Sequence, residues 1–250
     1  MRRRSERVAA GRFVVEGPQA VREALESLLE LYVVDLDDPL AVRAAAGGVD
    51  VVLVNDVVLT ALAETVSPQG LVGVAALLDV PLSDAVTPFS RLVTVLDQVS
   101  DPGNAGTVIR TADAAGADAV VLTRGSVDLH NGKCVRASAG SLWHLPVVAQ
   151  ASLDEVLALL RRTGLQVLAT SGDGSDDLDD LADGGVLTAP TAWVFGNEAA
   201  GLPPEVLEAA HRTVRIPMRG RAESLNLATA AAVCLYASAR AQRGPRVVPV

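Results

Sequence analysis

The sequence predicts an α/β protein with a parallel sheet, preceded by a smaller α/β unit. Half of its 250 residues are hydrophobic, which is enough to bury a full core. From Arg91 onward, short apolar runs alternate with helical stretches, as expected for buried parallel strands covered by helices. These runs are RLVTVLDQV, AVVLT, PVVA, QVLATS, AWVFGN and TVRIP. Ligands of such sheets bind beyond the carboxyl ends of the strands.

The first part of the chain predicts a separate small unit. FVVEG is expected to be a strand, and Pro18 suits the first turn of the helix that follows. LYVVDL, DVVLVN and LVGVAALL are expected to be further strands, with helices near 39–46 and 56–66. The two prolines between Val80 and Ser90 break this rhythm. We therefore expect an N-terminal domain over 1–80, a linker over 81–90 and a second domain over 91–250.

The composition limits the cellular setting and the cofactors. No apolar run is long enough to span a bilayer, and no apolar segment of a secretory signal follows the basic start. Cys134 and Cys234 match no metal-ligand spacing, and the three histidines are scattered. We expect a cytoplasmic protein with reduced core cysteines, without a metal and without a membrane segment.

The net charge of −9 does not by itself favour a nucleic-acid partner, because phosphate contacts need cations. However, the acidic residues are concentrated in 171–185, while arginines gather at the N-terminus and in 215–221. Global charge therefore does not decide whether the chain binds nucleic acid, and Arg7 and Arg12 are the candidate phosphate contacts if it does. Arg136 is another candidate, and an ordinary surface arginine is an equally good interpretation of it.

The segment from Val214 to Arg240 predicts a strand, a polar loop and an alanine-rich helix. Pro217 ends the strand, and Ser224 is expected to cap the helix. A bare helix N-terminus beside a strand end can bind an anionic group. The alternative is that Ser224 and Asn226 do no more than cap a buried helix.

A second strand–loop–helix covers Leu96 to Leu122. DPG predicts a turn, and Asn104 is expected to cap the following helix, in which Arg110 lies six residues further on among small and apolar residues. The alternative interpretations are that DPGN does no more than form a turn and that Arg110 is a solvent-exposed charge on the helix.

A third strand–loop–helix covers Ala192 to His211. Gly196 and Gly201 permit close backbone approach, and Glu198 in the loop could orient a neighbouring arginine. The segment contains neither the G-x-x-x-x-G-K-[ST] motif of a phosphate-binding loop nor the G-x-G-x-x-G motif of a dinucleotide site. The absence of the second motif disfavours a dinucleotide-dependent oxidoreductase.

Together, DPGNAGTVIR, FGNEAAGL and IPMRGRAESLN resemble the three motifs of the SpoU (TrmH) family of RNA ribose methyltransferases, in the family's order. KCVRASAGSLWHLPV also looks like this family, and GRFVVEGPQAVREAL looks like the start of its N-terminal substrate-binding domain. The resemblance implies a homodimer with a C-terminal trefoil knot that uses S-adenosylmethionine to methylate a ribose 2′-hydroxyl. An rRNA substrate is favoured over tRNA because members with this N-terminal domain typically modify rRNA, some of them to give antibiotic resistance.

The resemblance also implies site residues. The reaction site would comprise Asn104, Arg110, Glu198, Ser224 and Asn226. The cofactor would rest against the backbone of Phe195, Gly196, Asn197, Ile216, Met218 and Leu225. The family proposal makes Arg110 the base; a guanidinium with a pKa above about 12 could instead bind phosphate and stabilise the developing alkoxide. A tRNA methyltransferase and a non-catalytic RNA-binding or assembly protein of the same fold remain alternatives.

Overall fold

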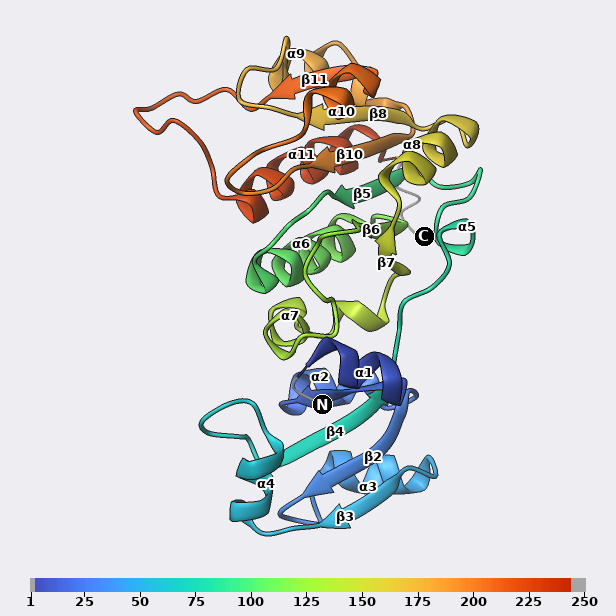
Figure 1. The fold of residues 1–250 in the computed structure, drawn as a ribbon, viewed down its shortest axis with the longest axis vertical. Helices are drawn as coiled ribbons and strands as arrows, with labels where there is room; N and C mark the ends of the chain where they lie inside the picture. The colour runs from blue at the N-terminus through green and yellow to red at the C-terminus, as the bar shows by residue number, and fades with distance from the viewer. Residues whose placement is uncertain (1–2, 244–250) are drawn as a thin grey trace, which may run out of the picture.

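The computed structural model describes residues 3–243, which form two sheets stacked along the long axis of the molecule (Figure 1). The smaller sheet and its helices come from the first third of the chain. Their bounds are α1 Arg4–Ala10, β1 Arg12–Glu16, α2 Pro18–Ala24, β2 Leu28–Val33, α3 Pro39–Ala46, β3 Asp50–Leu53, α4 Asp56–Leu62 and β4 Leu71–Ala76. All four strands predicted here are confirmed.

The smaller sheet has the order β1-β4-β2-β3. β4 runs antiparallel to both of its neighbours, whereas β2 and β3 are parallel. Alternate residues of β1 and β2 are buried, Phe13 and Val15 in one strand and Leu31 and Val33 in the other. This period of two is what a sheet with one covered face requires.

The larger sheet contains seven parallel strands in the order β7-β6-β5-β10-β8-β11-β9. The predicted parallel α/β architecture is therefore confirmed. The elements are α5 Leu82–Ala85, β5 Leu92–Leu96, α6 Pro102–Ala115, β6 Ala119–Thr123, α7 Gly132–Ser138, η1 Ser141–Trp143, β7 Val147–Ala151, α8 Leu153–Arg162, β8 Gln166–Thr170, β9 Asp176–Asp177, α9 Leu178–Asp183, η2 Val186–Thr188, β10 Thr191–Phe195, α10 Pro204–Ala209, β11 Arg212–Arg215 and α11 Leu227–Ala241.

Helices cover both faces of the larger sheet. Leu96 and Phe195 point to the face packed against α6 and α11, and Val95 and Val194 point to the face packed against α8 and α10. Successive strand residues thus supply two separate apolar layers, which explains why β5, β6 and β10 are buried along their whole length.

Two helix starts differ from the sequence prediction. α6 is capped by Asp101, whose Oδ1 accepts a hydrogen bond from the Asn104 amide at 2.8 Å, so Asn104 lies inside the first turn. α11 is capped by Asn226, which accepts from the Ala228 amide at 2.9 Å, and Ser224 lies two residues before the cap. In each case a nearby polar residue reaches the free amides better than the one expected.

A partly buried seam joins the two halves of the molecule. Arg7 donates from Nη2 to Asp128 Oδ2 at 2.6 Å, and its side chain is only 5% exposed. The Phe13 ring lies 4.6 Å from the His130 ring, centroid to centroid. Trp143 Nε1 donates to Ser27 Oγ at 2.8 Å. Since one apolar cluster runs through both halves, they pack as one body.

No helix within residues 3–243 is both long enough and apolar enough to cross a membrane.

Candidate active site

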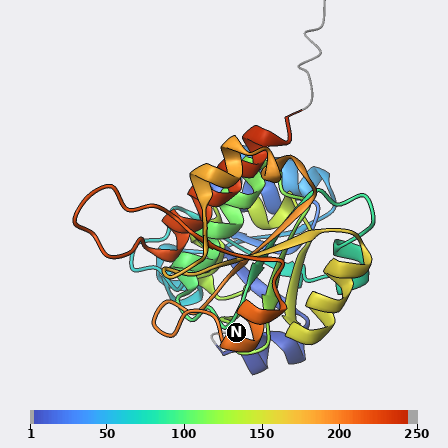
Figure 2. The ribbon, with the colours of Figure 1, turned by 90° about the horizontal axis from the view of Figure 1, so that it is seen from above.

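The three motif segments meet at the carboxyl edge of the larger sheet. The segment 97–104 follows β5, 196–202 follows β10, and 224–226 precedes α11. In Figure 1 these ends lie on the same side of the molecule as the long loop 216–226. Figure 2, the view from above, shows that this loop extends well away from the body of the protein.

Glu198 is the centre of the polar network at this edge. Its Oε1 accepts from Asn104 Nδ2 at 3.0 Å and from the Asp101 amide at 3.2 Å. Its Oε2 accepts from the Ser100 amide and hydroxyl. Partial burial raises the pKa of Glu198, but these hydrogen bonds outweigh it and hold the pKa below its usual value. The carboxylate is thus ionised and orients Asn104, rather than an arginine as expected from the sequence.

Asn226 joins the third motif to this network. Its Nδ2 donates to Asn104 Oδ1 at 3.0 Å, while its own Oδ1 caps α11. The amide orientation of Asn104 is therefore fixed from both sides, because its nitrogen faces Glu198 and its oxygen faces Asn226. Sequence motifs more than 90 residues apart are brought into direct hydrogen-bond contact.

Arg110 and Ser224, the other two candidates for the reaction site, are not part of this network. Both are exposed, and within residues 3–243 neither makes a side-chain hydrogen bond or ion pair. Ser224 lines the same cavity as Asn104 and Asn226. Arg110 lies six residues beyond Asn104 on α6, about 9 Å along the helix axis. Their groups are available to a bound molecule.

A cavity of about 540 Å³ lies against the network, and a smaller one of about 180 Å³ adjoins it. Every residue predicted to hold a cofactor lines one of the two. Phe195, Gly196, Asn197 and Leu225 line the larger cavity, and Ile216, Met218 and Leu225 line the smaller one.

Gly196 has to be a glycine for a packing reason. A Cβ there would collide with the carbonyl of Gly201 and would lie 2.6 Å from the Leu202 amide nitrogen. Asn197 and Gly201 exchange backbone hydrogen bonds at 3.1 and 2.9 Å, which closes the loop. The backbone of this loop can therefore approach a ligand closely.

The sequence reasoning missed Thr170, Ser171 and Gly172, which line both cavities. Their position directly after β8 was a usable signal, since ligands of parallel sheets bind beyond the carboxyl ends of strands. It also missed Lys133, whose Nζ lies 2.7 Å from Asp101 Oδ2. The hydrogen bond from Lys133 and the Asn104 amide hold the pKa of Asp101 below its usual value.

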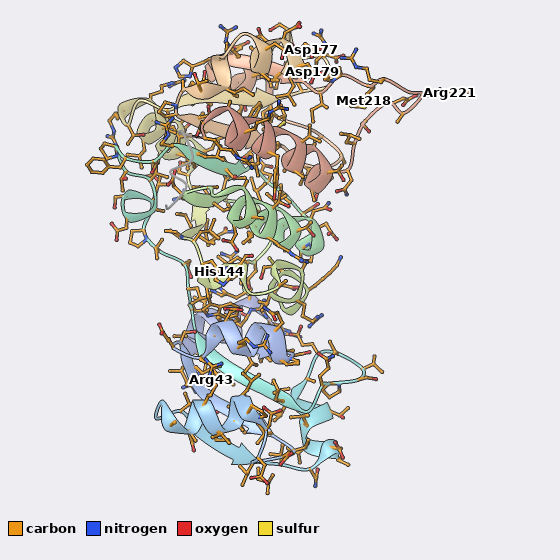
Figure 3. The ribbon with its side chains drawn as sticks, turned by 180° about the vertical axis from the view of Figure 1, so that it is seen from behind. Arg43, His144, Asp177, Asp179, Met218 and Arg221 are labelled. Carbon is orange, nitrogen blue, oxygen red and sulfur yellow. The ribbon has the colours of Figure 1, made fainter. Side chains whose placement is uncertain are left out.

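Two ion pairs join the end of β11 and the long loop to the acidic segment. Arg215 lies 3.4 Å from Asp177, and Arg219 lies 2.9 Å from Asp179. Figure 3 shows both aspartates beside the base of the loop, with Met218 and Arg221 further out along it. Two of the arginines that gather in 215–221 are therefore paired with carboxylates.

The three candidate RNA contacts also have carboxylate partners. Arg7 is buried and donates from both Nε and Nη2 to Asp128 Oδ2, which corrects its expected role: it holds the two halves together and does not face solvent. Arg12 lies 2.9 Å from Glu30, and its side chain is 42% exposed. Arg136 lies 3.5 Å from Glu16 and is 35% exposed.

Comparison with known proteins agrees with this architecture. Residues 91–236 match the SpoU rRNA Methylase family, and residues 1–73 match the MRM3-like substrate binding domain. The chain is 35% identical over 236 residues to the 23S rRNA (guanosine(2553)-2'-O)-methyltransferase RlmP of Bacillus subtilis strain 168, covering 93% of this chain and 90% of that protein.

Two solved structures are similar over almost the whole chain. The AdoMet-bound rRNA methyltransferase from Sinorhizobium meliloti gives a TM-score of 0.84 at 33% identity, covering 97% of this chain and 92% of that one. The SpoU methyltransferase AviRb from Streptomyces viridochromogenes, in complex with AdoMet, gives 0.84 at 30% identity, covering 95% and 93%.

The fold and the site define a parallel α/β protein with a polar ligand site at the carboxyl edge of its sheet. The chain belongs to the SpoU rRNA methylase family, because the family match covers more than half of its length. The resemblance drawn from the three motifs is thereby confirmed.

Proposed function

We propose that this chain is an S-adenosylmethionine-dependent methyltransferase that methylates the 2′-hydroxyl of a ribose in rRNA. The observation that carries the proposal is the hydrogen-bond network of Asn104, Glu198 and Asn226 at the mouth of the 540 Å³ cavity. The name of the Bacillus subtilis relative describes this reaction on 23S rRNA.

The cavity residues fit S-adenosylmethionine. The close-packed loop at Gly196 offers bare backbone, while Ile216, Met218 and Leu225 add apolar surface beside it. When bound, this cofactor supplies a methyl group on a sulfonium, which is already a good leaving group. The protein then has to align the ribose oxygen with that methyl and manage the hydroxyl proton.

The protein residues divide this work. Asn104 is fixed in one orientation and can hold a ribose or backbone group of the RNA. Arg110 is exposed, so its guanidinium can bind the neighbouring phosphate and stabilise negative charge that develops on the ribose oxygen. The exposed hydroxyl of Ser224 can hydrogen-bond to the ribose. A guanidinium stays protonated in proteins, which makes it a poor general base.

The two halves of the chain would have separate roles. We infer that residues 1–80 contribute RNA affinity and target choice, that 81–90 link the parts, and that 91–250 carry out the chemistry. Arg12 and Arg136 remain candidate RNA contacts, since both are partly exposed. The buried seam means that removal of residues 1–80 would expose apolar surface, so point variants test this division better than truncation.

We also infer a homodimer and a C-terminal trefoil knot, as the family resemblance implies. Exposed Val233 and Tyr236 lie on one face of α11, which supports an interface there. Their side chains are 39% and 49% exposed.

A tRNA substrate is the second candidate. A solved structure entitled "Structural insights into the 2-OH methylation of C/U34 on tRNA" is 35% identical, but the similarity covers 62% of this chain. The Bacillus subtilis relative, which matches 93% of this chain including the N-terminal domain, is named for 23S rRNA, and this favours rRNA. A purely structural role is disfavoured because the reaction-site network is intact.

The test uses the purified full-length chain with methyl-labelled S-adenosylmethionine. The substrates are rRNA and tRNA from cells that lack the gene. We expect label in the rRNA at one ribose 2′-oxygen, located by resistance to alkaline cleavage. Label in tRNA alone would support the second candidate, and cofactor binding without transfer to either RNA would contradict the enzymatic proposal.

A further inference from the structure

A second cavity, of about 360 Å³, lies at the seam between the two halves of the molecule. Three segments form it: the β1–α2 turn, the α4–β4 loop and α7. The lining residues are Glu16, Gly17, Gln19, Ala20, Thr65, Ser67, Pro68, Gln69, Leu71, Arg136 and Ala139. None of them lines the two cavities at the carboxyl edge of the larger sheet, and Arg136 is the candidate RNA contact named above.

The cavity is next to the active site along α7. Arg136 is at its edge, and Lys133 lies one helical turn earlier, where its ammonium contacts Asp101 at the start of α6. The carboxylate of Glu64 is so close to Gly132 that a Cβ there would collide with it. In Figure 1, the α4–β4 loop and α7 lie on the same side of the molecule as the site.

The shape of the loop over the cavity is fixed by Glu16. This buried carboxylate accepts hydrogen bonds from the backbone amides of Glu64 and Thr65. Arg136 lies 3.5 Å from Glu16 and 4.0 Å from Glu64, so the loop, β1 and α7 are held together. The cavity is thus built into the fold rather than left by loose packing.

The chemistry of the lining suits a planar, polar-edged group. Ala20 and Leu71, both almost fully buried, contribute apolar surface. At the rim, the side chains of Thr65, Ser67 and Gln69 make no hydrogen bond within residues 3–243. An apolar floor with a few unpaired polar groups is the usual design of a specific small-ligand site.

The charges around the cavity favour a nucleobase over a phosphate as its ligand. Two carboxylates, Glu16 and Glu64, face the single guanidinium of Arg136, so the local balance is unfavourable for a phosphate. Of the lining residues, the Glu16 carboxylate and the amide oxygen of Gln69 can accept a hydrogen bond from the exocyclic amino group of a base. Proteins read RNA sequence mostly from unpaired bases, through hydrogen bonds to their edges.

We propose that this cavity binds one unpaired nucleobase of the substrate RNA, close in sequence to the nucleotide that is methylated. The inference rests on the proposed function, since it assumes RNA at the active site. The α4–β4 loop would then help to choose the target RNA, because Gln69 would read the edge of the base. The partly exposed Lys133 would lie near the RNA backbone between this cavity and the active site.

The first test fills the cavity from an exposed position. Ser67→Trp places an indole in the cavity mouth, and Ser83→Trp, at an exposed serine of α5, is the matched control. Methyl transfer to protein-free 23S rRNA from cells lacking the gene is measured for both. We expect Ser67→Trp to raise the KM for RNA by about tenfold, in the range for one lost base contact. The Kd for S-adenosylmethionine and the KM of Ser83→Trp should stay at wild-type values.

A second test does not depend on filling the cavity with a large side chain. Both native cysteines are fully buried, so a benzophenone maleimide added to Ser67→Cys reacts at the introduced thiol. Light should then cross-link this residue to 23S rRNA within a few nucleotides of the methylated ribose. The same label on Ser83→Cys should not give that cross-link.

The outcomes separate the two proposals. A wild-type chain that transfers no methyl group to rRNA overturns the proposed function, and the nucleobase site with it. An active wild type with an unchanged RNA KM in folded Ser67→Trp overturns the nucleobase site alone. The nucleobase site alone is also overturned if the labels on Ser67→Cys and Ser83→Cys cross-link to the same nucleotides of 23S rRNA.

Discussion

Asn226 donates a hydrogen bond from Nδ2 to Oδ1 of Asn104 at 3.0 Å, across 122 positions of sequence. With its own Oδ1, the same side chain caps α11. One residue thus starts the last helix and fixes the amide of the first motif. Local helix formation and the geometry of the reaction site are therefore coupled.

Asn226→Ala should damage both functions of this residue. Loss of the cap costs about 1 kcal/mol of stability. Without the hydrogen bond Asn104 can turn, and misplacement of a substrate-positioning group costs on the order of 100-fold in rate. Urea unfolding and single-turnover methyl transfer measure the two effects separately.

Asn226→Asp is the matched control. Its carboxylate can still cap α11, but it places an acceptor against the Asn104 carbonyl oxygen. We expect near-normal stability with an activity as low as that of Asn226→Ala. Full activity in this variant would contradict the assigned role of the hydrogen bond.

Arg110→Ala should lose activity without losing stability. The side chain is exposed and makes no hydrogen bond or ion pair within residues 3–243, so the free energy of unfolding should change by less than about 0.5 kcal/mol. Removal of a group that stabilises charge in a transition state costs about 100-fold or more in kcat. Arg43→Ala, at an exposed arginine of α3 (Figure 3), should leave both quantities unchanged. A strongly destabilised Arg110→Ala would show that its role is structural.

Gly172→Val should block the proposed cofactor cavity while the fold is kept. A Cβ at Gly172 meets no atom within 4 Å, and the residue lines both cavities. Gly196 is less suitable, because its side chain would first collide with the backbone of Gly201. We expect the Kd for S-adenosylmethionine to rise by more than about tenfold in calorimetry. Gly220→Val, equally uncrowded but outside the cavities, should bind normally.

His144 should make stability depend on pH near neutrality. Its Nδ1 lies 2.7 Å from Asp113 and its Nε2 3.3 Å from Glu23, across the seam. The hydrogen bond with Asp113, aided by that with Glu23, raises the pKa of His144 above its usual value. A raised folded-state pKa means that the stabilisation is complete below about pH 6.5 and is lost as pH rises through the folded value.

The measurement compares wild type with His144→Gln by urea unfolding across this range. The difference in the free energy of unfolding should be largest at about pH 5.5 and should shrink at higher pH. In an Asp113→Asn background the difference should vary less with pH. A difference that grows with pH would have the wrong sign for this pair of contacts.

Tyr236→Asp should separate the inferred dimer. Aromatic residues at the centre of an interface often contribute about 2 kcal/mol or more, equal to about a 30-fold change in Kd. The side chain is half exposed in the single chain, so stability of the monomer should change little. Light scattering over a dilution series measures the association. A wild-type protein that is monomeric at all concentrations would end the dimer inference.

The motifs and most strands were predictable because they depend on local pattern. The apolar runs of β5, β6 and β10 are buried on both faces, so their composition alone indicates parallel strands. The candidate residues Asn104, Glu198 and Asn226 were each found from a motif, and they do meet in space. The partner of Glu198 was predicted wrongly, since the sequence does not show which side chains face it.

What the sequence by itself determined was the class of fold, the order of elements and the three motif segments, because each depends on residues close together in the chain. Tertiary structure alone decided which polar groups share hydrogen bonds. It buried Arg7 against Asp128, placed Thr170 in the cavity at the carboxyl edge of the larger sheet and built the seam cavity from three distant segments. The physical reason is that these contacts depend on which strands lie side by side, and local periodicity carries no information on the order β5-β10-β8.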